Sequence, residues 1–370
     1  MPARSKAREI ASKLVNIPLT IFTGLVAIGM LGAELTKWVG PTDWMLPSYL
    51  GIIFPLTSFL TLLCCMYWVF RRRWIRSAAS FLCLLICADG ILNTFSIGGI
   101  GTKTTNEGAT EIKVASYNVC LFNFYDKNSN VLPELEHLDA DIVCLQEYGY
   151  FLDNDGYLSR ADIDKKLKKK FPYSHLWMKT TKCGGTYGIA TYSKWPIDNK
   201  QEIEISDQKD AIYSDIKLDK KQIRVYNMHL RSNKLTNKDK EALKKLMTQT
   251  GSTGEEVGII TEKLSDAYKR REEQADKVVA NILNCQLPVI VCADFNDVPV
   301  SYTSHKFKSA GLKDCFKEKG IGYGRTFNDK RFPFRIDHIL HDSNFECTHY
   351  NRITSYASDH YLIQSTLLIE

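Results

Sequence analysis

Residues 288–297 read Pro-Val-Ile-Val-Cys-Ala-Asp-Phe-Asn-Asp. An apolar run of this length is typical of a buried strand, and it ends abruptly in Asp294, Asn296 and Asp297. The carboxyl end of a strand is where open α/β sheets bind ligands. Asp294 and Asn296 are two residues apart and share one face of an extended segment, and a carboxylate beside an amide suits a hard divalent cation or a phosphate. This stretch taken alone favours a simpler interpretation, a strand followed by an Asx-turn.

The same pattern, a polar residue at the end of an apolar strand, recurs four more times between residues 111 and 370. The further examples are Asn118 in 112–119, Gln146-Glu147 after 141–145, Asn227 and His229 in 224–230, and Asp337 and His338 in 335–340. Asp359-His360 is a related polar pair that precedes the last strand, 361–369. Each residue alone is explained by a turn, a surface position or a hydrogen-bonded core histidine. Their repeated place at strand ends favours one shared site. Helices are expected at 160–170, 237–248 and 258–284, so the domain is predicted to be α/β.

The ordered motifs resemble those of the endonuclease/exonuclease/phosphatase superfamily, which includes deoxyribonuclease I, abasic-site endonucleases, neutral sphingomyelinases and inositol-polyphosphate 5-phosphatases. The motifs are Ser116-Tyr117-Asn118, Leu145-Gln146-Glu147, residues 187–194, Asn227-Met228-His229-Leu230, residues 293–297, Arg335-Ile336-Asp337-His338 and Ser358-Asp359-His360. The resemblance spans residues 111–370. It implies a four-layer α/β sandwich, in which two mixed β-sheets pack face to face with helices outside.

The resemblance also implies metal-assisted hydrolysis of a phosphate ester, with Mg²⁺ as the usual ion and Mn²⁺ as the alternative. Glu147 is then expected to be the main metal ligand, helped by Asn118 and Asp359. Oxygen ligands of this kind suit Mg²⁺, which binds through few carboxylates and keeps several waters.

The remaining motif residues receive catalytic and substrate-binding roles from the same resemblance. Asp294 and Asn296 are expected to orient the attacking water and the phosphate, and His360 to pair with Asp337. His229 is expected to donate a proton or hydrogen bond to a phosphate or leaving-group oxygen. The general base stays open between the His360–Asp337 pair and Asp294. The expected substrate-binding residues are Tyr187, Asn227 and Arg335.

The first 96 residues form a different region, which is predicted to cross a membrane. Residues 19–33 and 44–70 carry no charge, and the apolar segment 77–95 is interrupted only by Asp89. A helix needs about 20 apolar residues to cross a bilayer, so three transmembrane helices are expected before the catalytic domain. The Gly/Thr-rich residues 97–110 are expected to be a linker to a domain at 111–370.

The orientation of the helices follows from the basic residues at their ends. The tail before residue 14 has four Lys or Arg, residues 71–76 have four Arg, and the segment between the first two helices has only Lys37. The tail and residues 71–76 are therefore expected in the cytoplasm. The prediction is a multi-pass protein of the cytoplasmic (inner) membrane, contacting lipid through its helices, with an extracytoplasmic catalytic domain.

Charge and cysteine content limit the function further. Beyond residue 100 the chain has 39 basic and 38 acidic residues, which gives no support for tight nonspecific nucleic-acid binding. The 11 Cys show no metal-binding spacing, and mostly reduced, buried thiols are expected.

Three function classes follow from these observations. The favoured one is a membrane-anchored, Mg²⁺-dependent phosphoesterase acting on a phosphodiester or phosphomonoester, with a phospholipid headgroup or nucleic acid as substrate. The alternatives are an extracytoplasmic nuclease acting on DNA or RNA, and a catalytically silent binding module with the same fold. A transporter is disfavoured because the helices carry almost no polar residues, and no protein partner is evident.

Overall fold

The computed structural model describes residues 2–98, 108–123, 130–151, 158–180, 185–205, 208–219, 221–234, 236, 238–239, 241–242, 254–329 and 333–370. The chain divides into two compact units. Unit 1 comprises Met1–Thr94 and Val300–Tyr302, and unit 2 comprises Phe95–Pro299 and Thr303–Glu370. Most of the expected linker 97–110, most of the expected helix at 237–248, and Cys183 lie outside the described residues.

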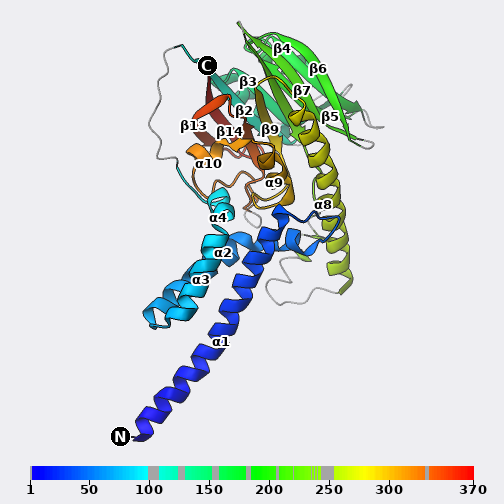
Figure 1. Cartoon of the computed structure of the whole chain (residues 1–370). Helices are drawn as coiled ribbons and strands as arrows, with labels where there is room; N and C mark the ends of the chain where they lie inside the picture. Colours follow the sequence, from blue (N-terminus) through cyan, green and yellow to red (C-terminus); the bar gives the residue numbers. More distant parts are fainter. Residues whose placement is uncertain are drawn as a thin grey trace. The chain divides into compact units, whose positions relative to one another are not determined.

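Unit 1 is helical (Figure 1). Its elements are α1 (Pro2–Glu34), the short 3-10 helix η1 (Leu35–Lys37), α2 (Leu46–Phe70), α3 (Trp74–Ile86) and α4 (Ala88–Thr94). Two stretches, Lys13–Lys37 and Leu46–Phe70, are long and apolar enough to cross a membrane. The prediction of a third, continuous transmembrane helix at 77–95 is wrong, because α3 and α4 are bent by 63° at a break. Asp89 lies in the first turn of α4, where its carboxylate accepts a hydrogen bond from Asn93 at 3.0 Å.

Contacts inside unit 1 show how far α3 and α4 extend along α2. The Arg76 guanidinium lies 4.7 Å from the Trp68 ring, so α3 begins beside the carboxyl end of α2. At the other end, Asp89 lies 3.8 Å from Lys37 Nζ, which belongs to the turn between α1 and α2. The broken pair α3–α4 therefore runs from one end of α2 to the other.

Unit 2 contains two six-stranded sheets and a two-stranded ribbon. The first sheet has the order β13-β14-β2-β3-β5-β4, with β2 (Thr110–Asn118), β3 (Ile142–Phe151), β4 (Tyr173–Thr180), β5 (Gly185–Ser193), β13 (Phe345–Ile353) and β14 (Leu362–Ile369). The second has the order β10-β12-β9-β8-β7-β6, with β6 (Ile197–Ile205), β7 (Gln208–Leu218), β8 (Lys221–His229), β9 (Val289–Asp294), β10 (Lys313–Asp314) and β12 (Asp337–His341). The ribbon pairs β1 (Ser96–Ile97) with β11 (Ile321–Gly322).

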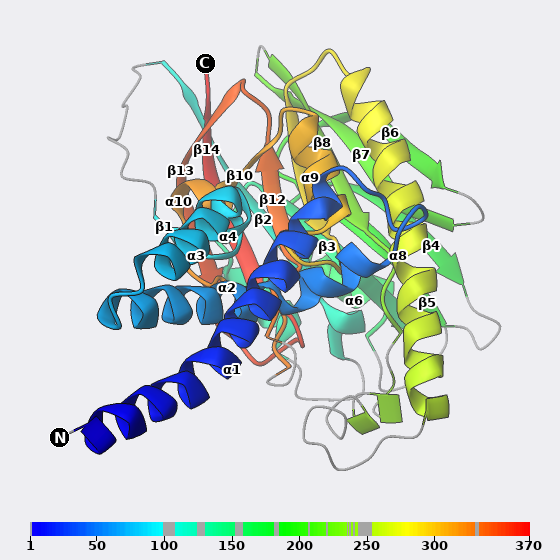
Figure 2. The same ribbon diagram turned by 60° about the horizontal axis from the view of Figure 1, so that its bottom comes forward.

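The two sheets are layers of a sandwich with helices on both outer faces. Apolar side chains of β2, β3 and β14 meet those of β7, β8 and β9 between the sheets. Helices α5 (Val131–His137) and α6 (Arg160–Leu167) bury the outer face of the first sheet. Helices α8 (Gly254–Leu283) and α9 (Tyr302–Ser309) bury that of the second, as Figure 2 shows for α8. The predicted four-layer α/β sandwich with two mixed sheets is confirmed.

Two short helices complete the described elements. They are η2 (Cys120–Asn123), which follows β2, and α10 (Cys315–Lys319), which follows β10. The Asp314 side chain caps α10 by accepting a hydrogen bond from the Phe316 amide, as expected for an aspartate at a helix start. The described cysteines are free thiols and most of them are buried, as expected for their burial, while their redox state stays a prediction.

Candidate active site

Strand direction brings the predicted residues to one end of the sandwich, where the central strands finish. Each sheet contains one parallel pair, β2–β3 and β8–β9, whose carboxyl ends therefore lie together. In the first pair Asn118 lies opposite Gln146, and in the second His229 lies opposite Asp294. The antiparallel strand β12 begins with Asp337 directly opposite Asp294.

Glu147 is presented to this edge by an irregularity in β3. The register between β3 and β5 shifts between Leu145 and Tyr148, so the chain bulges at Gln146 and Glu147. Glu147 has φ of 47°, a left-handed conformation that is unusual for a residue with a side chain. Asn296 shares this feature, with φ of 52°. Strained backbone conformations of this kind persist only where the surrounding structure holds them in place, and they are most frequent at functional sites.

A continuous chain of contacts joins side chains from both sheets. Asn118 Nδ2 lies 2.9 Å from Asp294 Oδ2 and 3.3 Å from Glu147 Oε1. His229 Nε2 lies 3.6 Å from Glu147 Oε1 and 3.7 Å from Asp294 Oδ2. These four residues come from β2, β3, β8 and β9, so the site exists only when the two sheets pack together.

His360 and Asp337 close the other side of this cluster. His360 Nδ1 lies 2.9 Å from Asp337 Oδ2, and His360 Nε2 lies 3.9 Å from Asp294 Oδ2. Burial disfavours the charged imidazolium, but the carboxylates of Asp337 and Asp294 outweigh burial and raise the pKa of His360 to about 10. The ring is therefore held as a cation between two carboxylates, and Nδ1–H donates to Asp337.

Asp294 is the most enclosed carboxylate of the cluster. Its side chain is fully buried, and burial followed by the nearby charge of Asp337 raises the pKa of Asp294. The two histidines and the Asn118 amide act in the opposite direction. A carboxyl group with a raised pKa beside two imidazoles is suited to accept a proton from water.

The donors present fit a divalent cation. Within the described residues, Asp294, Asp337 and His360 offer ligand atoms within 4.8 Å of one another. In this group His360 Nδ1 already lies 2.9 Å from Asp337 Oδ2. Glu147, by contrast, has a carboxylate that is 35% exposed, and His229 Nε2 beside it is buried without a hydrogen-bond partner. An unsatisfied buried polar atom facing an available carboxylate is consistent with a bound ion or phosphate between them.

Asp359, the third expected metal ligand, lies on the same side of the site. Its side chain is exposed, and both Asp359 and Glu147 act on the Cys120 thiol: burial raises the pKa of Cys120 first, followed by the charges of these two carboxylates.

The three residues that were predicted to bind substrate differ in their exposure to solvent. Tyr187 is partly exposed on β5, opposite Gly149 and close to the Glu147 bulge. Asn227 and Arg335 are buried, and their contact with substrate stays a prediction. Asn227 Nδ2 donates to the Ala190 carbonyl at 2.9 Å, and Arg335 Nη1 donates to Asp314 at 2.8 Å. Asn227 joins the two sheets beneath the site, and Arg335 is directed toward the start of α10.

The structure adds positioning residues that the motifs did not identify as functional. Ser358 Oγ donates to the Asn118 carbonyl at 2.7 Å and accepts from the His360 amide at 3.2 Å. Thr326 Oγ1 accepts from the Asp337 amide at 3.1 Å. Ser358 is the first residue of the Ser358-Asp359-His360 motif but received no role there, whereas nothing in the sequence around Thr326 indicates its role.

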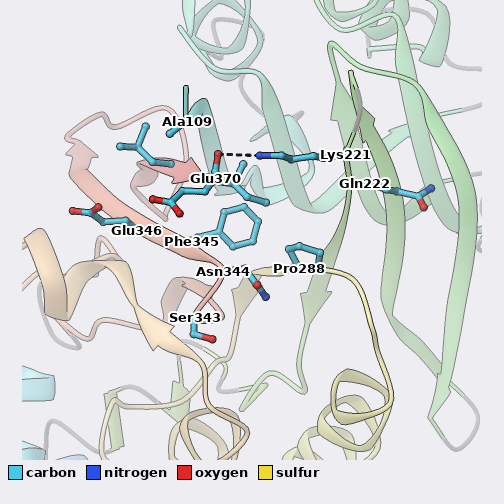
Figure 3. Close-up of a pocket in the computed structure, with 11 residues that line it drawn as sticks. Ala109, Lys221, Gln222, Pro288, Ser343, Asn344, Phe345, Glu346 and Glu370 are labelled. Atoms are coloured by element: carbon cyan, nitrogen blue, oxygen red, sulfur yellow. Dashed lines mark hydrogen bonds between the residues drawn. The ribbon is translucent and has the colours of Figure 1, made fainter. Parts of the chain in front are cut away.

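A cavity of about 670 Å³ lies at the other end of the sandwich. Its lining includes Lys221, which starts β8, and Pro288, which precedes β9 (Figure 3). Since His229 and Asp294 end the same two strands, the cavity is separated from the cluster by the length of β8 and β9. It is not part of the candidate active site.

Comparisons with known proteins agree with this architecture. The model of the Endonuclease/Exonuclease/phosphatase family matches residues 115–360, and the model of a domain of unknown function matches residues 13–94. The fold is similar to an endonuclease/exonuclease/phosphatase from Beutenbergia cavernae, with 13% identity over 70% of this chain and 72% of that one and a TM-score of 0.50. It is also similar to the catalytic domain of human Nocturnin with bound sulfate, with 17% identity over 73% and 100% and a TM-score of 0.50. No curated protein sequence matches the chain.

Proposed function

The chain belongs to the endonuclease/exonuclease/phosphatase family, whose members hydrolyse phosphoester bonds, and we propose that its strand-end cluster hydrolyses a phosphate ester with a divalent metal ion. The observation that carries the proposal is the contact chain from Asn118 through Glu147, His229 and Asp294 to His360. It joins acidic, amide and imidazole groups from separate strands within 2.9 to 3.9 Å of one another.

Glu147 is the proposed main ligand for Mg²⁺, with Asn118 and Asp359 beside it. A bound Mg²⁺ offsets the negative charge of the phosphate and of the leaving oxygen. The cluster brings together the carboxylates of Glu147, Asp294 and Asp337, so a divalent ion would also offset their negative charge. The oxygen-only ligand set favours Mg²⁺ or Mn²⁺ over softer ions.

The remaining groups act on water and on the phosphate. Asp294, with its raised pKa and its place beside both histidines, accepts the proton of the attacking water in this proposal. His360, fixed by Asp337, supplies positive charge to the phosphate oxygens as negative charge develops on them. His229, whose Nε2 makes no hydrogen bond and lies 3.6 Å from Glu147 and 3.7 Å from Asp294, donates to the leaving oxygen or to a non-bridging oxygen.

The proposed substrate is the phosphate ester of a lipid headgroup. The same chain carries two apolar helices long enough to cross a membrane, so its catalytic unit is tethered at a lipid surface. The near-neutral charge beyond residue 100 offers no general attraction for the phosphate backbone of nucleic acid.

The proposed location is the cytoplasmic membrane, with the broken pair α3–α4 completing a third crossing. Arg76 lies at one end of α2, beside Trp68, and Asp89 lies at the other, beside Lys37. A chain that enters at the Arg71–Arg76 side and leaves beyond Asp89 places the catalytic unit on the side opposite the basic tail, which is the extracytoplasmic side.

A substrate panel tests the function. The full chain in nanodiscs with Mg²⁺ is incubated with phosphatidylinositol, sphingomyelin, plasmid DNA, RNA and bis(p-nitrophenyl) phosphate. Turnover of a lipid with little or no turnover of DNA or RNA is expected. Preferential cleavage of DNA or RNA makes the chain a nuclease, and no turnover of any ester supports a silent binding module.

A further inference from the structure

Helix α8 carries two polar side chains that are buried and have no part in the proposed chemistry. Arg271 is 1% exposed and Gln274 is 4% exposed, and they lie three residues apart on one face of the helix. Burying a guanidinium is costly unless its donors are paired, so its partners indicate what the position requires.

Both side chains bind the segment that follows β8. Arg271 Nη1 donates to the Arg231 carbonyl at 2.8 Å and to Asn233 Oδ1 at 2.9 Å. Gln274 Oε1 accepts from the Arg231 amide at 2.8 Å. The backbone donor and acceptor of Arg231 are thus both held by α8, two residues after His229.

Arg271 also binds the segment that follows β9. Its Nε donates to Asp297 Oδ2 at 3.2 Å, and Asp297 comes directly after Asn296. The two segments are already in contact, because the Leu230 amide donates to the Asp294 carbonyl at 2.9 Å and Asn296 Nδ2 donates to the Leu230 carbonyl at 3.1 Å. We call Arg271 and Gln274, with Arg231, Asn233 and Asp297, the Arg271 clamp.

We propose that Arg271 is a positioning residue, which fixes His229 relative to Asp294 and Asn296 by holding the two segments that carry them. The proposal rests on the proposed phosphoesterase function. A planar guanidinium can bind three acceptors in fixed directions at once, which a lysine ammonium cannot reproduce. Misplacing a reacting group by about 1 Å can reduce the rate by about 100-fold.

The test compares three variants of the full chain in detergent. Arg271→Met removes the clamp. Arg270→Met is the matched control, because the neighbouring Arg270 is 51% exposed and pairs with Asp266 on the same helix. Val279→Ala is the stability control, because Val279 lies on α8 itself, eight residues after Arg271, and its buried side chain packs in the apolar core. Initial rates are measured on bis(p-nitrophenyl) phosphate with saturating Mg²⁺.

The expected result is a kcat lowered by about 10- to 100-fold in Arg271→Met, with KM changed by less than about threefold. Arg270→Met and Val279→Ala should retain kcat within about twofold, although Val279→Ala melts at a lower temperature. The double variant Arg271→Met/Asp297→Asn removes the unpaired buried carboxylate and should recover melting temperature without recovering kcat. An unchanged kcat in Arg271→Met, or an equal loss in Val279→Ala, overturns the proposal.

Amide hydrogen exchange provides a readout that needs no activity. The clamp predicts about tenfold faster exchange in the peptide covering residues 229–234 of Arg271→Met, and unchanged exchange there in Arg270→Met. Unchanged exchange in both variants contradicts the clamp. If the wild-type protein hydrolyses no ester but the exchange result holds, the proposed function fails while the positioning of the two segments by Arg271 stands.

Discussion

Two buried aspartates in unit 2 have pKa values that are shifted in opposite directions. Asp294 faces Asp337 and two histidines, and burial raises its pKa. Asp314 is equally buried, but the charge of Arg335 and the hydrogen bond with His338 outweigh burial and hold its pKa well below the usual range. Ionised Asp294 therefore lowers the stability of the fold at neutral pH, whereas ionised Asp314 raises it.

Substitution of these two residues should separate function from stability. Asp294→Asn is expected to lower the hydrolysis rate by at least about 100-fold while leaving the free energy of unfolding unchanged or higher in metal-free protein. Asp314→Asn leaves Arg335 buried without its carboxylate partner and should cost about 3–5 kcal/mol. Thermal melting with parallel rate assays checks both variants. A large loss of stability in Asp294→Asn would contradict the role given to its surroundings.

His175 makes stability depend on pH. It is buried on β4 with Nδ1 2.9 Å from Ser214 Oγ, and burial followed by the charge of Lys200 lowers the pKa of His175 from 6.5 to about 4. In the unfolded chain His175 takes up a proton near pH 6.5, whereas in the folded chain it does so only near pH 4. The free energy of unfolding therefore falls as the pH drops from 6.5 to 4. The full shift corresponds to about 3 kcal/mol.

The measurement is the free energy of unfolding between pH 4 and pH 7.5 for the wild type and His175→Gln. The wild type should lose more stability on acidification than the variant. Equal pH slopes for the two proteins would show that His175 does not titrate as described.

At the residue scale, the sequence predicted the site through the order of its strand-end motifs. It did not predict that Asn227 and Arg335 are buried. Asn227 shares a face with His229 but lies two residues back from the end of β8, opposite Cys292, and is therefore between the sheets rather than at the edge. Arg335 precedes β12, and only the position of α10 determines that its guanidinium turns to Asp314. Neither the burial of Asn227 nor the partner of Arg335 can be predicted from the residues next to them in the sequence.

At the scale of elements, the central strands were predictable and the outer ones were not. The strands β2, β3, β9 and β14 have long apolar runs because they are covered on both faces. The strands β4, β6, β7 and β13 were not predicted. Strand β6, for example, reads Ile-Asp-Asn-Lys-Gln-Glu-Ile-Glu-Ile, since it lies at a sheet edge with most side chains exposed. The break in the third apolar segment was signalled only by Asp89.

The bulge that presents Glu147 depends on a glycine in the neighbouring strand. A Cβ at Gly188 would lie 1.9 Å from the Trp177 carbonyl oxygen of β4, a contact that requires the backbone to move. Gly188 pairs with Tyr148, at the end of the bulge, so its displacement disturbs Glu147 as well.

Gly188→Ala is therefore expected to lower stability by about 1–3 kcal/mol and to reduce activity. Gly258→Ala is the control, because Gly258 lies in α8 with no atom within 4 Å of an added Cβ. It should be neutral or raise stability by up to about 1 kcal/mol. Thermal melting compares the two, and a Gly188→Ala variant as stable as Gly258→Ala would contradict the close approach of β4 and β5.

At the scale of the whole molecule, the sequence predicted a membrane region joined to a catalytic domain, and the proposed third crossing determines which side the domain faces. Three crossings place unit 2 outside the cytoplasm, whereas two crossings return it to the side of the basic tail. Protease added to intact spheroplasts is expected to digest the catalytic domain. Complete protection, with digestion only after lysis, would show that α3 and α4 do not cross.

In the proposed function Glu147 holds a divalent ion on which phosphoester hydrolysis depends. This role is tested by the hydrolysis rate of bis(p-nitrophenyl) phosphate by the full chain during a Mg²⁺ titration, with wild type and Glu147→Gln in parallel. We expect a saturable Mg²⁺ dependence, complete loss of the rate in excess EDTA, and a rate at least about 100-fold lower in Glu147→Gln at unchanged melting temperature. Full activity in EDTA, or an undiminished rate in Glu147→Gln, would contradict this role of Glu147.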